Sequence, residues 1–335
     1  MKNYLPLFIF FSLLVVPISY AQTLKGYVFD KKTQEPLLGV SVYFDGTTIG
    51  TTTDMSGKFT IKYKPSTESA LVISYVGYEK QLLDVRKLEN GVKINMELRP
   101  QALGTVYLEN DPWSRKKKME IFKREFLGKS VERFECKILN LDDIKLVYNP
   151  MTQKLNAYSD KPLIIKNRYL GYMVSYTMEE FEADLRLTNS GEALTRSVYV
   201  EGSSFYTERN ERVRRKHRIA REREYGESVL HFMRSLATKK LKENGYQIFH
   251  NGFIVPPYKY FKITQMGEDT NIELTTEKVI IVYDRFHKSF MTILQAKKEF
   301  VINKYGNYSP PKKILFGGVL GDKRMANTLP LNYNL

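Results

Sequence analysis

The sequence predicts an N-terminal all-β sandwich followed by a β-rich α+β region. Between residues 24 and 98, short strand-like runs alternate with turn signals at regular spacing, which is typical of an antiparallel sandwich. The 23 Tyr and 19 Phe residues favour strands over helices. Two helical patterns follow later in the chain, beginning at Ser114 and Ser228. Because 42% of the 335 residues are apolar, the chain can build a packed core, and this composition excludes global disorder.

The N-terminal segment predicts export from a bacterial cytoplasm. Lys2 supplies a positive charge, residues 5–18 are almost all apolar, and small residues precede a cleavage site after Ala21. Cleavage there leaves Gln22 as the first mature residue. The alternative is an uncleaved membrane anchor, but the apolar run is shorter than the roughly 20 residues that a spanning helix needs, and it contains Pro17. We therefore expect an exported protein in the periplasm or associated with the outer membrane.

The chain has a single cysteine, Cys136, far from the cleavage site. An acylated N-terminal cysteine and an intramolecular disulfide are therefore both excluded for the mature chain, and its stability must come from packing. Residues 134–138 alternate between apolar and polar, with Cys136 on the apolar side. This pattern predicts a small buried hydrophobe rather than a reactive thiol.

The net charge of +15 predicts contact with polyanions. In a cytoplasmic protein such a charge would indicate nucleic acid. An exported protein meets lipopolysaccharide phosphates, anionic lipid headgroups and acidic glycans instead, so we expect no nucleic-acid partner and allow peripheral contact with a membrane. Attraction of this kind depends on the salt concentration.

The predicted strands of the sandwich are residues 24–30, 40–44, 58–63 and 70–75, with a last one marked by apolar residues at positions 94, 96 and 98. The turn before the third of these strands carries a recognisable signal. We expect Asp54 to accept backbone N–H groups, Gly57 to adopt a positive φ, and Phe59 to return the chain to the core. A calcium site at Asp54 is the alternative, but one carboxylate falls far short of the roughly six to eight oxygen ligands that Ca²⁺ takes.

Four motifs in this stretch, residues 26–28, 36–40, 50–59 and 74–78, resemble the carboxypeptidase-like regulatory domain in the order expected. This family has a transthyretin-like (Ig-like) sandwich. It is found behind the catalytic domain of some metallocarboxypeptidases and at the N-terminus of Bacteroidetes outer-membrane TonB-dependent transporters. The resemblance implies such a sandwich over residues 22–100 and a place in the envelope, and it implies no active site. The chain is too short to include a transporter barrel of its own.

Residues 101–114 are a predicted linker, and residues 115–335 form the α+β region. Ser114 is the expected N-cap of a helix that continues to Leu127, with Gly128 at its C-terminal end. The strands predicted after this helix are residues 134–138, 144–148, 155–158, 163–165, 172–181, 197–199, 279–283 and 290–294.

A basic segment, residues 203–245, interrupts these strands with 12 Lys or Arg residues against 6 Glu, and we predict it to be helical. Ser228 is the expected N-cap of a helix that carries three lysines in its last turns and ends at Gly245. The charges have two interpretations, a solvated helical face or an anion-binding site. Glutamates 208, 211, 222 and 224 favour the first, because pairing along a helix would neutralise the cations. The candidate anion-binding residues are Arg212, Arg214, Arg215, Lys216 and Arg218.

The long region also has a resemblance of its own. Residues 126–130, 136–140, 162–167, 170–172 and 226–232 resemble the C-terminal part of Bacteroidetes envelope proteins that carry a regulatory-type sandwich in front. The resemblance implies an envelope location and no particular reaction.

The sequence identifies no catalytic, cofactor-binding or metal-binding residue. None of the four histidines has a glutamate three residues further on, as a zinc carboxypeptidase requires, and no His-Glu-x-x-His, Gly-x-Ser-x-Gly or P-loop motif is present. Residues 317–321 are rich in glycine, but we expect no strand–helix context that would hold phosphate there. The neighbouring acids at 142–143 and 179–180 suit glycoside hydrolysis poorly, because adjacent side chains on a strand point in opposite directions.

These observations predict a non-enzymatic accessory protein of the cell envelope that binds a partner at the outer membrane. The partner classes are an outer-membrane protein, a glycan or lipopolysaccharide. Two alternatives remain open: an enzyme of unknown type, acting on glycans, with its site in residues 115–335, and an accessory of TonB-dependent transport.

Overall fold

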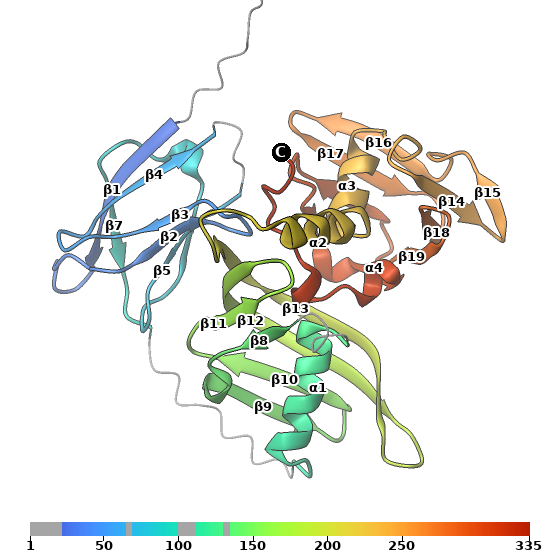
Figure 1. The fold of residues 1–335 in the computed structure, drawn as a ribbon, viewed down its shortest axis with the longest axis horizontal. Coiled ribbons are helices and arrows are strands. Elements are labelled where there is room, and N and C mark those ends of the chain that lie inside the picture. The colour runs from blue at the N-terminus through green and yellow to red at the C-terminus, as the bar shows by residue number, and fades with distance from the viewer. Residues whose placement is uncertain (1–21, 65–68, 100–110, 130–134) are drawn as a thin grey trace, which may run out of the picture.

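The computed structural model describes residues 22–64, 69–99, 111–129 and 135–335, which form three parts with separate hydrophobic cores (Figure 1). The expected signal segment, most of the expected linker and Phe134 lie outside the described residues. No helix in the described ranges has the length and apolar character needed to cross a bilayer.

The first part is a β-sandwich of two sheets with the strand orders β4-β1-β7 and β3-β2-β5-β6. β1 pairs with β4 in antiparallel and with β7 in parallel orientation. Val28, Phe44 and Phe59 lie in the core between the sheets. The strands are β1 (Gln22–Asp30), β2 (Ser41–Phe44), β3 (Gly50–Thr52), β4 (Lys58–Tyr63), β5 (Leu71–Ser74), β6 (Gln81–Leu83) and β7 (Val92–Met96).

The turn between β3 and β4 has the predicted construction. The Asp54 carboxylate accepts the backbone N–H groups of Ser56, at 2.9 Å, and Lys58, at 3.0 Å. Gly57 has a φ of 71°, and a Cβ atom on it would lie 2.5 Å from the Val28 carbonyl oxygen. Phe59 is buried directly after the turn. The oxygens of Asp54 therefore serve the turn itself.

The second part is a sheet with the order β8-β11-β12-β10-β9, to which β13 adds along the free edge of β12, covered by α1 (Arg115–Leu127). Ser114 caps α1 by accepting the Lys117 N–H, as predicted. Phe122 and Phe126 of α1 pack edge-on against Phe181 and Tyr176 of β12. The strands are β8 (Cys136–Ile138), β9 (Ile144–Asn149), β10 (Lys154–Ser159), β11 (Leu163–Asn167), β12 (Tyr172–Leu187) and β13 (Ala193–Glu208).

The third part combines two sheets, β15-β14-β18-β19-β22 and β16-β17-β20-β21, with α3 (Val229–Ala237). Phe232 and Leu236 of α3 share a core with Ile272 and Phe300. The region predicted as one α+β unit thus contains two cores. Its strands are β14 (Tyr246–His250), β15 (Phe253–Val255), β16 (Phe261–Met266), β17 (Asp269–Leu274), β18 (Lys278–Tyr283), β19 (His287–Ile293), β20 (Glu299–Ile302), β21 (Tyr308–Ser309) and β22 (Ile314–Gly318).

The structure corrects the predicted helical segment 203–245 at both ends. Residues 203–208 belong to β13, because they continue its pairing with β12 as far as Glu208 opposite Tyr172. The helix capped by Ser228 ends at Ala237 rather than near Gly245. Lys239 then takes a φ of 55°, and the chain turns so that Leu241 enters the third core. Between β13 and α3 lies α2 (Arg215–Gly226), which is helical as expected.

The glycine-rich stretch 317–321 also differs from the prediction, because β22 runs directly into a short helix, α4 (Val319–Asp322). One of the amides at the start of this helix already has a partner, since Leu320 N–H donates to the Ser289 hydroxyl at 3.0 Å. The strand–helix context exists, but the helix has only four residues and its end is bonded to the protein itself.

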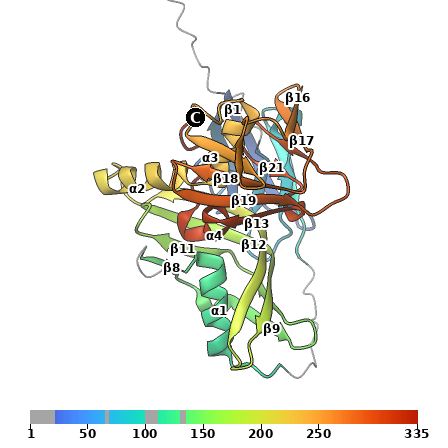
Figure 2. The same ribbon diagram turned by 90° about the vertical axis from the view of Figure 1, so that its right-hand side faces the viewer.

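The sandwich is attached to the second part at one end. Gly46 N–H donates to the Ser204 carbonyl at 2.8 Å, and the Asp45 carboxylate accepts the Ser204 N–H at 2.8 Å. The C-terminal segment contacts the same turn, because Leu331 N–H donates a hydrogen bond to the Gly46 carbonyl. Arg234 of α3 donates in turn to the carbonyls of Leu331 and Tyr333. All three parts therefore meet around the C-terminal segment, close to α2 (Figures 1 and 2).

Candidate anion-binding surface

Helix α2 has one buried face and one exposed face. Its buried side chains are His217, Ala220, Arg221 and Glu224, which follow one another at helical spacing. Two of these four are charged, so each requires a partner in the interior. The net charge of the exposed face therefore depends on which carboxylates are already bonded to these buried residues.

Glu208 forms a salt bridge with the buried Arg221. The terminal nitrogens of Arg221 donate to both carboxylate oxygens of Glu208, at 2.8 and 2.7 Å, and its Nε donates to the Leu170 carbonyl at 2.8 Å. The guanidinium carbon also lies 3.8 Å from the ring centre of Tyr172. Glu208 is therefore held by a buried arginine and is not available to neutralise the exposed ones.

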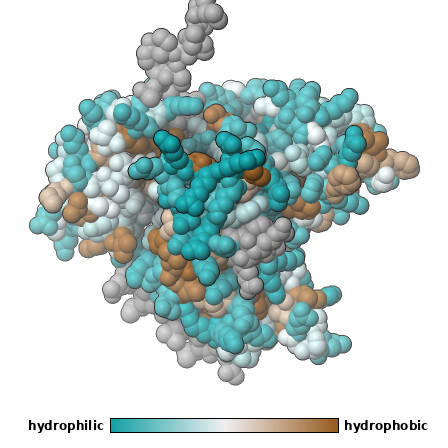
Figure 3. All heavy atoms as spheres, viewed as in Figure 1, coloured by the Kyte–Doolittle hydropathy of each residue, from teal (hydrophilic) through white to brown (hydrophobic). Residues whose placement is uncertain are grey.

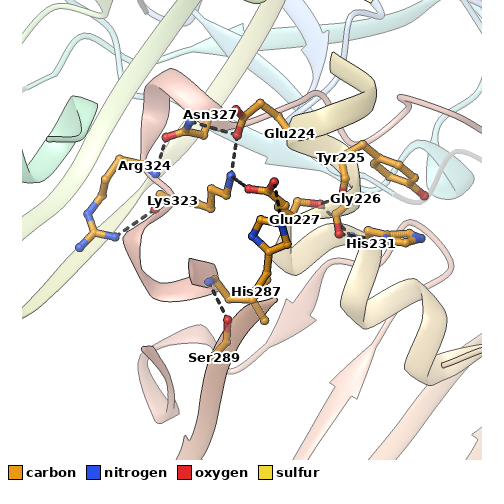
Figure 4. A network of polar contacts seen from close by, with 12 residues as sticks. Glu224, Tyr225, Gly226, Glu227, His231, His287, Ser289, Lys323, Arg324 and Asn327 are labelled. Carbon is orange, nitrogen blue, oxygen red and sulfur yellow. Dashed lines mark hydrogen bonds and ion pairs between the residues drawn. The ribbon is translucent and has the colours of Figure 1, made fainter. Parts of the chain in front are cut away.

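Glu224 is taken up by a second internal network (Figure 4). Its carboxylate accepts hydrogen bonds from Lys323 at 2.8 Å, from the Asn327 side chain at 3.0 Å and from the Tyr169 hydroxyl at 3.0 Å. Lys323 also pairs with Glu227 at 2.7 Å. The network joins α2 to the C-terminal segment, and its carboxylates point away from the outer face of the helix.

The outer face consequently carries an excess of positive charge. We call the residues concerned the α2 basic surface; they are Arg212, Arg214, Arg215, Lys216, Arg218 and Arg223. All six are exposed, and none has an ion-pair partner among the described residues. Of the four glutamates expected to neutralise them, Glu208 and Glu224 are bonded to other residues. In the described part of the chain, only Glu211 and Glu222 of these four are both exposed and without an ion-pair partner. Figure 3 shows a broad hydrophilic area on this face.

The positive charges of this segment also affect the pKa of His217. This side chain is buried against Gly171, where a Cβ atom would lie 2.3 Å from its Nδ1. Burial lowers the pKa of His217, and the nearby cations of Lys216, Arg221 and Arg214 lower that pKa further. The positive charges around α2 thus lie close enough together to act on one imidazole.

The structure brings all five predicted anion-binding residues onto one surface and adds Arg223. It also shows two apolar residues there that the sequence reasoning missed. Val213 and Ile219 are 46% and 48% exposed, and both lie among the cations. A helical projection of residues 215–226 would have placed Ile219 on the side opposite the buried His217 and Arg221.

Several other residues considered in the sequence analysis lie in structural settings. Cys136 is buried as predicted, and burial raises the pKa of its thiol to about 12. Glu179 and Glu180 pair separately with Lys80, at 2.6 Å, and Lys312, at 2.8 Å. In the ranges that the structure describes, no three His, Cys, Asp or Glu side chains are grouped so that they could hold a metal ion.

His231 lies in an aromatic setting rather than in a cleft. Its Nδ1 is 3.0 Å from the Tyr246 hydroxyl and 3.2 Å from the Gly226 carbonyl. Burial lowers its pKa. A hollow of about 490 Å³ elsewhere on the third part is lined by the ion pairs Lys262–Glu273 and Lys297–Glu299.

Comparison with known proteins identifies the first part. Residues 24–106 match the family model of the CarboxypepD_reg-like domain, so the sandwich is a domain of this type. A stretch of 63 residues is 43% identical to the TonB-dependent receptor SusC of Bacteroides thetaiotaomicron. The match covers 19% of this chain and only 6% of that receptor. The similarity therefore extends over only a small part of either protein.

Proposed function

We propose that this chain is a non-enzymatic binding protein of the cell envelope, which uses the α2 basic surface to hold an anionic partner. The observation that carries this proposal is the use of Glu208 and Glu224 in bonds to other residues. This leaves six exposed cations opposed by two exposed glutamates, Glu211 and Glu222, that have no ion-pair partner in the described ranges. A solvated face designed only for solubility has no need to remove its own counter-charges.

The domain composition supports a location in the cell envelope. A CarboxypepD_reg-like sandwich precedes the basic surface, and a stretch of 63 residues of the chain is similar to part of a TonB-dependent receptor. The N-terminal 21 residues have the pattern of an export signal. A role as an accessory of TonB-dependent transport is the second candidate, and the similarity to that receptor favours it.

The partners that fit are those with closely spaced negative groups at the outer membrane, such as lipopolysaccharide, an acidic glycan or an acidic face of an outer-membrane protein. Each basic residue near an anionic surface contributes about 1 kcal/mol. Six such residues on the helix α2 and just before it are enough for a measurable, salt-sensitive association, although each contributes little by itself.

A soluble polyanion tests the proposal without involving lipid. The probe is dextran sulfate, and the protein is the mature chain, residues 22–335. We expect replacement of Arg214, Arg215, Lys216 and Arg218 by Ser to weaken binding at least tenfold. The matched control replaces four exposed lysines of the sandwich by Ser, at the same cost in net charge: Lys32, Lys58, Lys62 and Lys93. Equal loss in both variants would show that only net charge matters and would refute a binding site on α2.

A further inference from the structure

We infer that the α2 basic surface docks onto an anionic lipid bilayer, with Val213 and Ile219 inserted between the headgroups. This inference rests on the proposed function, because it uses the same cations, and it names the partner as a lipid surface.

The position of Ile219 carries the argument. On an α-helix, residues three or four positions apart are neighbours on one face. Ile219 therefore has Arg215 and Lys216 on one side and Arg223 on the other, and it leaves nearly half of its surface, 48%, in water. Val213, in the segment before α2, lies between Arg212 and Arg214 in the sequence and is 46% exposed. Both exposed apolar residues thus have basic residues as neighbours.

This combination fits a membrane interface better than a hydrated polymer. Phosphate groups at a bilayer surface accept the charges of Arg and Lys, while the acyl boundary just below accepts apolar side chains. An acidic glycan offers the charges but no apolar layer, so Val213 and Ile219 would gain nothing from it. A nucleic acid would not meet an exported chain.

The shape of the molecule permits contact with a flat surface. Figure 2 shows α2 projecting beyond the neighbouring helices and strands on one side of the molecule. The residues from 211 to 216 are all exposed, and burial begins only at His217. The cations at the start of α2 are therefore accessible to a flat surface.

The first test separates the contribution of apolar insertion to binding from that of electrostatic attraction. Mature wild type and the variant Ile219→Ser are compared on mixed phosphatidylglycerol–phosphatidylcholine vesicles and on dextran sulfate. Burial of the exposed half of an isoleucine predicts about fivefold weaker vesicle binding for the variant. Its binding to dextran sulfate should be unchanged. Met151→Ser is the control, since Met151 is 89% exposed in the turn between β9 and β10, remote from α2.

The second test measures insertion directly. A polarity-sensitive fluorophore on Ile219→Cys should shift its emission to the blue when anionic vesicles are added, whereas the same label on Met151→Cys should not. Cys136 is buried and leaves the label on the introduced cysteine. Loss of affinity together with the blue shift supports insertion.

Vesicle binding by Ile219→Ser equal to that of wild type, with a label that stays in water, would overturn the inference and leave the proposed function standing. Equal binding of dextran sulfate by wild type and the four-serine variant of α2 would refute the proposed function itself. The two failures are therefore distinguishable.

Discussion

The guanidinium carbon of Arg221 lies 3.8 Å from the ring centre of Tyr172, so this arginine of the basic segment is part of the interior. Its partner Glu208 comes from the end of β13, and Tyr172 begins the strand that pairs with it. The contact fixes α2 to the long hairpin of the second part. It also explains why seven neighbouring cations do not share one role: Arg221 stabilises the fold, and the others remain at the surface.

The first prediction follows from this contact. Arg221→Gln should lower the free energy of unfolding by about 2–3 kcal/mol, because it removes two charge-assisted hydrogen bonds and a cation–π contact from a side chain that is only 5% exposed. Urea unfolding of the mature chain measures this. Arg218→Gln, on the exposed face, should change the free energy by less than about 0.5 kcal/mol. Similar effects of both variants would contradict the assigned roles.

The second prediction concerns the turn before β4. Gly57→Val should destabilise the mature chain by roughly 1–3 kcal/mol, because the φ of 71° is strained for a β-branched residue and its Cβ meets the Val28 carbonyl. Gly91→Val is the matched control, since Gly91 has a φ of 88° but no atom within 4 Å of the Cβ position. The control should therefore lose less, and an unchanged melting temperature for Gly57→Val would show that the turn does not hold this conformation.

The third prediction concerns pH. Burial lowers the pKa of His217 in the folded chain below the usual value of about 6.5, which the unfolded chain retains. As the pH falls through about 6.5, the unfolded chain binds a proton that the folded chain does not, so the free energy of unfolding decreases. His217→Gln should show a smaller decrease between about pH 7.5 and 5.5. Urea midpoints across this range, measured for both proteins, check it, and parallel curves would mean that His217 does not contribute.

Local signals predicted the parts of the fold that depend on neighbours in sequence. The turn at Asp54 and the cap at Ser114 each need only a few consecutive residues, and both were predicted correctly. The end of α3 was not. The apolar spacing continues from Ala237 to Leu241, but Leu241 is held by the Tyr258 hydroxyl, 17 residues further on, which no local pattern reveals.

The candidate site was predictable to the same extent. The run of cations around Arg214 was visible in the sequence, but its net charge at the surface was not. Glu224 is bound by Lys323 and Asn327, about 100 residues later in the chain, so the sequence alone left neutralisation along the helix open. Tertiary contacts, rather than helical spacing, decide which glutamates remain beside the arginines.

The fourth prediction concerns export. The mature protein should begin at Gln22 and should be recovered in the periplasmic or outer-membrane fraction, because the first 21 residues combine a positive start, an apolar run and small residues before the cleavage point. N-terminal sequencing of the protein from fractionated cells measures this. An intact Met1 in the cytoplasmic fraction would rule the prediction out.

The last prediction is the salt dependence of binding by the α2 basic surface. Exposed charges are screened beyond about 10 Å at an ionic strength of about 0.1 M. Sedimentation of the mature chain with phosphatidylglycerol vesicles should therefore decrease steadily as salt is added. Replacement of Arg214, Arg215, Lys216 and Arg218 by Ser should reduce the fraction bound at low salt and flatten this dependence, since about 1 kcal/mol per residue is lost.

The four-lysine variant of the sandwich has the same net charge as the four-serine variant of α2. It should nevertheless retain the wild-type salt dependence, because Lys32, Lys58, Lys62 and Lys93 lie outside the α2 basic surface. Glu211 and Glu222 provide a test in the opposite direction. Both are exposed acids of the segment and have no ion-pair partner in the described ranges, so replacing both by Gln should strengthen binding at low salt and steepen its loss as salt rises. Identical curves for the wild type, the four-serine variant of α2 and the Gln variant would mean that these charges serve solubility alone.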